Sequence, residues 1–250
     1  GLLYNEAIAR GYDGLATGHY ARIVEENGRF LLYKAKDISK DQSYVLYMLT
    51  QNALSKTLFP LGELTKEQAR KKAEENGFVN ANKKDSQDIC FVPDGDYASF
   101  IENNSSFKSE KGRYSDIAGN YLGEHRGIIN YTTGQRKGLG IALGKHAFVI
   151  SKDAKSNEVT LGDEEFLFYD KVIVDDVNFI PFDKLEKEMR VLAKLRYRQK
   201  EQPATIKPLS EKRVLIEFDE PQRAPSKGQS AVFYVGDMVI GGGKISWGEK

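Results

Sequence analysis

The sequence contains one cysteine, Cys90, which lies between a charged polar run and a short apolar run. A cysteine in a folded protein is either a small inert core residue or a thiolate that acts as a nucleophile. Lys83 and Lys84 favour the thiolate, whereas Asp85 and Asp88 disfavour it. This segment therefore permits reactivity at Cys90, and the inert interpretation stays open on these residues alone.

A second candidate site lies near the N-terminus, at Gly18 and His19. The two residues stand at the end of a short predicted strand, residues 14–18, that follows a helix. In an α/β unit, ligands bind beyond the carboxyl ends of the strands, so both residues are placed to contact one. A surface histidine with a local hydrogen bond is an equally good interpretation of His19.

A compact polar cluster, residues 39–43, precedes a predicted helix. Asp41 or Ser43 can cap that helix, because a side-chain oxygen at this position accepts a hydrogen bond from a free backbone N–H. Capping does not account for Lys40 and Gln42, which therefore remain candidates for binding.

Residues 134–140 form a basic, glycine-rich loop. Glycines let a backbone approach a phosphate closely, and Arg136 and Lys137 add positive charge. A solvated hairpin tip explains the same residues equally well.

A second basic segment, residues 191–200, is predicted to be a strand. An extended backbone would place four cations on one face, namely Lys194, Arg196, Arg198 and Lys200. Such a face fits a contact with a phosphate backbone. The solvated exterior of a barrel is the competing interpretation.

The composition is that of an ordinary globular protein, with 40% hydrophobic and 29% charged residues among 250. One cysteine excludes an internal disulfide framework and fits a reducing compartment. No apolar run approaches the roughly 18 residues of a membrane span, so we expect no membrane partner. The net charge of +1 gives no global attraction to nucleic acid, so such binding requires local patches.

The first part of the chain predicts an α/β region. A helix is expected over residues 2–10, and a second helix, with a capping box at its start, over residues 65–76. Residues 29–36 are predicted to be an edge strand. Asp96 is predicted to cap a short helix.

The second part predicts β-structure. From Tyr121 onward, short runs rich in Val, Ile, Tyr and Thr are separated by turn residues. Residues 190–250 are expected to form a small β-barrel whose turns contain Gly228–Gln229 and Gly241–Gly243.

Several segments in order carry a family resemblance. In the first half they are Ala16-Thr-Gly-His-Tyr-Ala21, Lys40-Asp-Gln-Ser-Tyr44, Leu58-Phe-Pro-Leu-Gly62, Lys84-Asp-Ser86 and Ile89-Cys-Phe91. In the second half they are Tyr131-Thr-Thr-Gly-Gln-Arg-Lys-Gly-Leu-Gly140, Leu195-Arg-Tyr-Arg-Gln199, Phe218-Asp-Glu-Pro-Gln-Arg223, Gly228-Gln229, Ala231-Val-Phe-Tyr234 and Gly241-Gly-Gly243. The ordered set resembles the tRNA-specific 2-thiouridylases, which thiolate the wobble uridine of certain tRNAs.

The resemblance implies an α/β plus β fold with three parts. These are the rear of a Rossmann-like adenylating nucleotide domain in residues 1–55 with the loop 80–97, a mixed central domain in residues 56–79 and 98–188, and a C-terminal tRNA-binding β-barrel in residues 190–250.

The resemblance also implies a mechanism. ATP, with Mg²⁺ as its counter-ion, would adenylate the C2 oxygen of the uridine, and a persulfide on Cys90 would attack C2 as AMP leaves. A second cysteine would free the sulfur through a disulfide bond. The implied partners are the anticodon stem-loop of tRNA and a cysteine desulfurase or sulfur-relay protein, and the implied location is the cytoplasm.

The resemblance assigns roles to nine residues. Cys90 would be catalytic and Gly18 would contact ATP. The residues that would contact tRNA are His19, Lys40, Asp41, Gln42, Arg196, Tyr197 and Gln229.

Some family features are absent from the 250 residues. These are the Ser-Gly-Gly-x-Asp-Ser phosphate loop, the motif that contacts the target base and a second cysteine. All three precede the matched region in the family, and the chain begins with Gly1, so we expect an N-terminally truncated chain that does not turn over alone.

Two other functions remain open. One is a non-catalytic RNA-binding fragment in which Cys90 is buried and inert. The other is an AMP-forming enzyme that acts on a small acid, although such a substrate requires neither basic segment.

Overall fold

The computed structural model describes residues 2–79, 81, 92, 96–106 and 108–249. Cys90 lies outside the described residues. The chain divides into two compact units. Unit 1 consists of residues 1–83, 170–221 and 227–250, and unit 2 of residues 84–169 and 222–226.

Unit 1 opens with a helix and a short parallel sheet. Helix α1 (Leu2–Ala9) is followed by Gly11, whose φ of 82° belongs to the left-handed region favoured by glycine at helix ends. Strand β1 (Leu15–Ala16) pairs in parallel with β4 (Thr57–Leu58). The predicted helix and short strand are confirmed.

A hairpin connects this sheet to the rest of unit 1. Strands β2 (Ala21–Glu26) and β3 (Arg29–Lys34) pair through a tight turn in which Asn27 and Gly28 both have positive φ. Strand β3 also pairs with β14, so the prediction that it is an edge strand is wrong, because β2 occupies the edge.

Short helices follow the hairpin, and their bounds are η1 (Ile38–Lys40), α2 (Ser43–Leu46), α3 (Gln51–Leu54) and α4 (Lys66–Glu75). The predicted capping box of α4 is confirmed. The Thr65 hydroxyl accepts from the backbone N–H of Gln68, and the Gln68 side chain accepts from the backbone N–H of Thr65.

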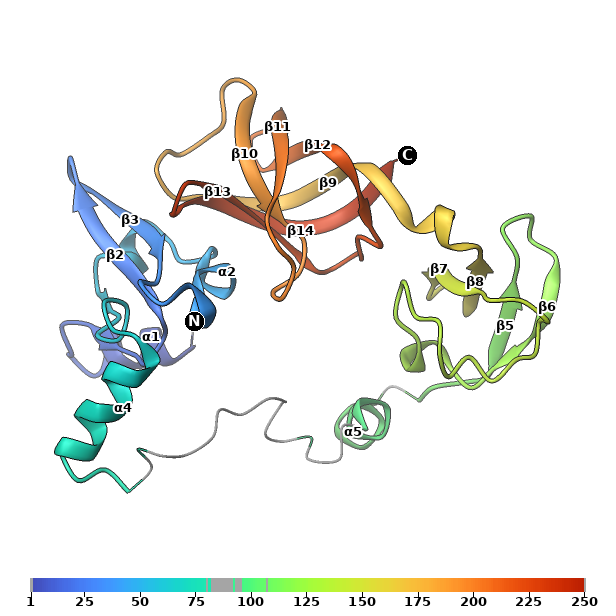
Figure 1. Cartoon of the computed structure of the whole chain (residues 1–250), viewed down its shortest axis with the longest axis horizontal. Helices are drawn as coiled ribbons and strands as arrows, with labels where there is room; N and C mark the ends of the chain where they lie inside the picture. The colour runs from blue at the N-terminus through green and yellow to red at the C-terminus, as the bar shows by residue number, and fades with distance from the viewer. Residues whose placement is uncertain (1, 80, 82–91, 93–95, 107, 250) are drawn as a thin grey trace. The chain divides into compact units, whose positions relative to one another are not determined.

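The remainder of unit 1 is a closed six-stranded barrel, of which only the first two residues of β9 and the last two of β12 are assigned to unit 2. Its strands are β9 (Phe168–Phe179), β10 (Met189–Lys194), β11 (Gln202–Ser210), β12 (Arg213–Arg223), β13 (Ser230–Val235) and β14 (Met238–Glu249). Strand neighbours run β13-β10-β11-β12-β9-β14, and pairing of β13 with β14 closes the ring (Figure 1).

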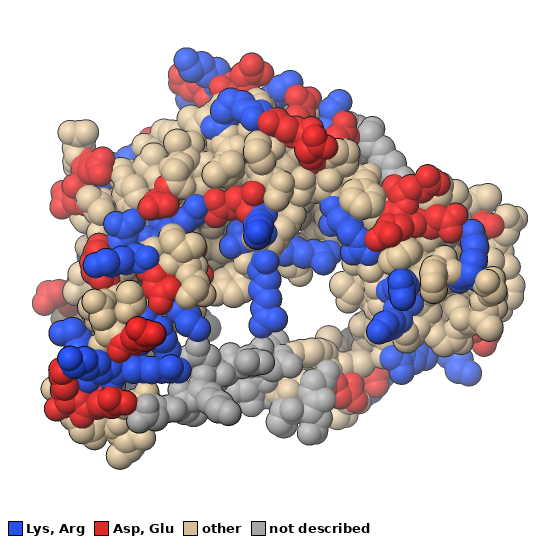
Figure 2. Space-filling view, viewed as in Figure 1, with Lys and Arg blue, Asp and Glu red and all other residues tan. Residues whose placement is uncertain are grey.

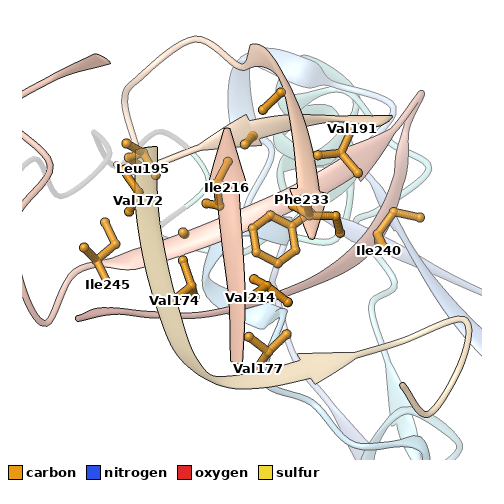
Figure 3. Packing of buried hydrophobic residues seen from close by; sticks show 14 of the residues in the cluster. Val172, Val174, Val177, Val191, Leu195, Val214, Ile216, Phe233, Ile240 and Ile245 are labelled. Atoms are coloured by element: carbon orange, nitrogen blue, oxygen red, sulfur yellow. The ribbon is translucent and has the colours of Figure 1, made fainter. Parts of the chain in front are cut away.

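The barrel interior is filled with branched apolar side chains. Val174, Ile216 and Phe233 come from different strands and point toward one another in the enclosed space (Figure 3). Ile216 and Phe233 are completely buried. The alternation of buried and exposed residues along these strands follows from their period of two.

The glycine triplet of β14 corrects one prediction. Gly241–Gly243 lie inside the strand and not in a turn. A Cβ on Gly242 would come within 2.8 Å of the Tyr47 ring and 2.6 Å of the Ala231 carbonyl oxygen. Glycine is required there because another segment packs directly on the backbone.

Unit 2 contains a helix and a mixed sheet. Its elements are α5 (Tyr97–Asn104), β5 (Gly112–Ser115), β6 (Tyr121–His125), η2 (Ile128–Asn130), β7 (Phe148–Asp153), β8 (Glu158–Gly162) and η3 (Glu164–Leu167). Asp96 caps α5, as predicted, by accepting from the backbone N–H of Ser99. The sheet order is β6-β5-β8-β7, with β5 and β8 parallel.

The rings of Tyr114, His125 and Tyr131 form the centre of this unit, edge to face at centroid distances of 5.4 to 5.5 Å. Burial lowers the pKa of His125. Its Nδ1 accepts from the Gly127 N–H at 3.0 Å, and its Nε2 lies 3.2 Å from the Asn157 carbonyl oxygen.

Two of the expected domain boundaries differ from this organisation. The barrel begins at Phe168 with β9 and not near residue 190, because β9 pairs with β12 and β14. Residues 56–79 belong to unit 1 and not to the central domain. A hydrogen bond from the Lys66 N–H to Asp37 Oδ2 at 3.0 Å helps to hold α4 there.

None of the helices in the described part of the chain is long and apolar enough to cross a membrane.

Candidate nucleic-acid interface

The basic segment after β10 is a turn and not the predicted strand. Strand β10 ends at Lys194, and the N–H of Gln199 then donates to the Arg196 carbonyl at 3.1 Å. The Gln199 side chain accepts from the Leu195 N–H at 3.2 Å. These local bonds replace the ladder of a strand, so the prediction of four cations on one strand face is wrong.

The turn places Tyr197 against the segment that follows β3. The Tyr197 hydroxyl donates to the Asp41 carbonyl oxygen at 3.2 Å. Its ring lies 5.9 Å from the ring of Tyr44, and the Lys194 ammonium lies within 5.8 Å of both ring centroids. Tyr44 is buried, whereas Tyr197 is 43% exposed, so one aromatic ring is accessible above another.

Positive charges surround this ring pair. Burial raises the pKa of Tyr44 to about 12, and the nearby Arg196 opposes that rise. Burial also raises the pKa of Tyr197, and Arg198 and Lys40 act against that shift. Burial is the main cause of both rises in pKa, and the Asp41 carboxylate adds to that of Tyr197. The opposing effects place Arg196, Arg198 and Lys40 close to the rings.

The side chain of Asp41 is engaged in holding its own segment. Its carboxylate accepts from the Ala35 N–H at 3.0 Å and from the Ser43 hydroxyl at 2.7 Å. The carboxylate thus holds the start of α2 and presents the Asp41 carbonyl to Tyr197. The N-cap of α2 is Gln42, which makes no side-chain cap hydrogen bond, so the prediction that Asp41 or Ser43 caps this helix is wrong. Lys40, the last residue of η1, is half-buried beside it.

Gln42 connects this segment to Tyr20, the residue directly before β2. Its side-chain oxygen accepts from the Tyr20 N–H at 3.0 Å, and its own N–H donates to the Tyr20 carbonyl at 2.8 Å. His19, the next residue back, bonds through Nδ1 to the Thr17 hydroxyl at 2.8 Å. Gly18 is exposed beyond β1, where a ligand can approach the backbone.

The barrel contributes the remaining predicted residue. Gln229 is exposed in the turn before β13, and its carbonyl accepts from the Ile245 N–H at 2.8 Å. The adjacent Ser230 carbonyl accepts from the Tyr44 hydroxyl at 2.8 Å. Gln229 therefore directly precedes the residue that binds the Tyr44 hydroxyl.

One chain of contacts therefore links four segments that are separated in sequence. It runs from Tyr20 through Gln42 and Asp41 to Tyr197, and from Tyr44 to Ser230. All of the predicted binding residues except Cys90, which lies outside the described residues, belong to these segments or adjoin them. An exposed ring for stacking, with cations around it, suits a single-stranded nucleic acid.

The overall charge of the chain does not favour such a partner. On the face drawn in Figure 2, basic and acidic side chains are intermixed, in agreement with the net charge of +1. The Glu201 carboxylate near Tyr234 is already paired with Lys34 at 2.8 Å. Selectivity must therefore come from local groups such as the ring pair.

The sequence analysis assigns no binding role to Tyr44. The residue ends one of the motifs that carry the resemblance, but its pattern predicts only a place in a helix. Its place behind Tyr197 depends on contacts between residues more than 150 positions apart, as the bond between Tyr197 and Asp41 also does.

Three family models match the chain in order. They are described as the tRNA methyl transferase HUP domain over residues 1–94, the tRNA methyl transferase PRC-barrel domain over residues 98–163 and the aminomethyltransferase beta-barrel domain over residues 169–245.

Curated relatives match almost all of the chain. The tRNA-specific 2-thiouridylase MnmA 1 of Clostridium tetani is 51% identical over 241 residues, which are 96% of this chain and 67% of the relative. MnmA 2 of Clostridium botulinum strain Hall is 52% identical, covering 97% and 69%. MnmA of Acetivibrio thermocellus is also 52% identical, covering 97% and 68%.

The chain belongs to the tRNA-specific 2-thiouridylases. In this 2-thiouridylase the interface combines two of the matched stretches, since Asp41 and Tyr44 lie in the HUP stretch and Tyr197 lies in the barrel stretch. The predicted fold, a Rossmann-like part followed by a central domain and a C-terminal β-barrel, is confirmed.

Proposed function

We propose that this protein binds tRNA and transfers sulfur to C2 of its wobble uridine. The observation that carries the proposal is the identity of 51% to 52%, over 96% to 97% of the chain, with relatives named as tRNA-specific 2-thiouridylases. Two of the family models carry methyl transferase names, but each of them matches only one part of the chain. The named relatives match nearly the whole chain.

The interface supports the RNA part of the proposal. The exposed ring of Tyr197 offers a stacking surface, and Lys194 and Arg196 supply charge for the phosphates. To expose C2 of the uridine, the nucleotide must be splayed out of the anticodon stack, and aromatic surfaces stabilise such conformations. His19, Lys40, Gln42 and Gln229 would contact the same RNA from adjoining positions.

The chemical part of the proposal assigns sulfur transfer to Cys90. ATP, bound in part at Gly18 with Mg²⁺ as counter-ion, would adenylate the C2 oxygen with release of pyrophosphate. The terminal sulfur of a Cys90 persulfide would form a bond to C2, and AMP would leave with the oxygen. A second thiol, which these 250 residues do not contain, would then attack the Cys90 sulfur, form a disulfide with it and leave the outer sulfur on the base. A cysteine desulfurase or a sulfur-relay protein would supply the persulfide.

The RNA part is tested by titrating unmodified tRNA at several salt concentrations. We expect Arg196→Ala to weaken binding and to lower the slope of log affinity against log salt by about one, because one phosphate contact is lost. Lys212→Ala, at the exposed turn between β11 and β12, is the matched control. Absence of tRNA binding by the wild type would contradict the proposed function.

A further inference from the structure

The basic loop of unit 2 forms a hollow of about 600 Å³, separate from the interface described above. It is lined by residues 136–143 and 145–147, and we call it the basic hollow. Arg136, Lys137, Lys145 and His146 are its charged or titratable side chains. All four are exposed.

An alternation of residue sizes shapes this surface. Leu139, Ile141 and Leu143 pack into the apolar core of unit 2. The residues between and beyond them are small and exposed, namely Gly138, Gly140, Ala142 and Gly144. The segment is not a strand. Because glycine has no side chain and alanine has only a methyl group, the backbone at these exposed positions is open to solvent.

The backbone of this segment offers donors. Among the residues that the structure describes, no backbone N–H from Arg136 to His146 donates to another protein group. Gly138 and Gly140 have φ of 73° and 71°, which glycine adopts without strain. Successive free N–H groups in a glycine-rich turn form a concave surface that suits an anion.

The loop is held from behind, so its shape is defined. Gln135 accepts from the Thr132 N–H at 2.9 Å and donates to the Lys137 carbonyl at 3.0 Å. The Arg223 guanidinium lies 3.2 Å from Glu164 and over the Phe148 ring, at the back of Gly134.

The free charge of the hollow comes from two side chains. Lys145 is paired with Asp163 at 2.9 Å, which neutralises it. Within the described ranges, Arg136 and Lys137 have neither an ion pair nor a side-chain hydrogen bond. The lining residues include no Phe, Tyr or Trp. Two cations beside an open backbone fit a phosphate group.

We propose that the basic hollow binds phosphates of the tRNA backbone and is a second RNA contact, carried by unit 2. This inference rests on the proposed function, which supplies the RNA. A phosphodiester would accept from the backbone N–H groups, while Arg136 and Lys137 would neutralise its charge.

The test measures tRNA binding against salt concentration for Arg136→Ala/Lys137→Ala. The matched control is Lys111→Ala/Lys155→Ala, which removes the same charge from exposed positions of the same unit outside the hollow. We expect the hollow variant to bind on the order of tenfold more weakly at 0.1 M salt, and its salt slope to fall by one to about two. The control should keep the wild-type slope.

A second pair of variants tests the location without removing a cation. Ala142→Glu places a carboxylate in the hollow, and Ala142→Gln places a neutral group of the same size there. We expect the Glu variant to bind tRNA on the order of tenfold more weakly than the Gln variant, with unchanged circular dichroism for both.

Two results would overturn the inference. One is equal slopes for the hollow variant and the control while the wild type binds tRNA, which leaves the proposed function intact. The other is saturable binding of inorganic phosphate that requires Arg136 and Lys137 while the tRNA slope is unchanged, because the hollow would then serve a free phosphate. A wild type that does not bind tRNA contradicts the proposed function itself.

Discussion

At the scale of single residues, the accessible ring of Tyr197 makes the most specific contribution to the interface. Its hydroxyl is bonded to the Asp41 carbonyl, and the buried Tyr44 supports its ring from behind. The ring is therefore held in place before any ligand arrives, and less conformational entropy is lost when a base stacks on it.

We predict that Tyr197→Ala weakens tRNA binding by about 1 to 3 kcal/mol, the usual effect of removing one aromatic stacking partner. Tyr197→Phe should retain most of the affinity, since it keeps the ring and loses one hydrogen bond. Tyr121→Ala is the control, because Tyr121 is an exposed ring of unit 2. Fluorescence anisotropy with labelled tRNA measures all four proteins, and an equal loss in the Ala and Phe variants would argue against stacking.

At the scale of elements, sequence patterns predict local structure well. The capping box of α4 and the cap of α5 depend on residues three positions apart, and both are present as predicted. The β-character of the second half follows from residue type and alternation. Local propensity and local hydrogen bonds depend on residues that are close in sequence, so they can be predicted from it.

Elements that depend on distant partners were predicted less well. The turn at residues 195–199 resembles a strand in its alternation, but β10 lacks pairing beyond Lys194, and the Gln199 side chain closes the turn. The glycines of β14 resemble turn residues, but they accommodate Tyr47 from a segment far away in sequence. Neither outcome can be derived without knowing the tertiary neighbours.

The sheet of unit 2 gives a prediction about pH. Its buried His125 accepts at Nδ1 from Gly127, and its ring packs on Gly112 with no room for a Cβ. Burial lowers its pKa below the ordinary value of 6.5, so the folded state binds the proton less well than the unfolded state. Its contribution to stability is complete above pH 6.5 and is lost as the pH falls below that value.

Amide hydrogen exchange of β5, β6 and β8 at pH 7.5 and pH 5 measures this effect. We expect lower protection at pH 5 in the wild type, and a smaller pH dependence in His125→Gln, whose side chain cannot take up a proton. A His125 pKa at or above 6.5 in an NMR titration would show that the buried ring tolerates its charge.

At the scale of the whole molecule, the ordered motifs predicted the family, and the comparisons confirm it over nearly the full chain. The residues predicted to bind tRNA come together from the HUP and barrel stretches, and their roles stay predictions. The geometry around Cys90 lies outside the described residues, so its role rests on the sequence resemblance.

The proposed sulfur transfer requires that this protein carries sulfur on Cys90. The intact mass of the folded chain after incubation with a cysteine desulfurase and cysteine tests this requirement. We expect a gain of about 32 Da, one sulfur atom, that is lost on reduction and absent from Cys90→Ser. An unchanged mass in the presence of an active desulfurase, with Cys90 slow to alkylate, would contradict it and favour a tRNA-binding protein with an inert thiol.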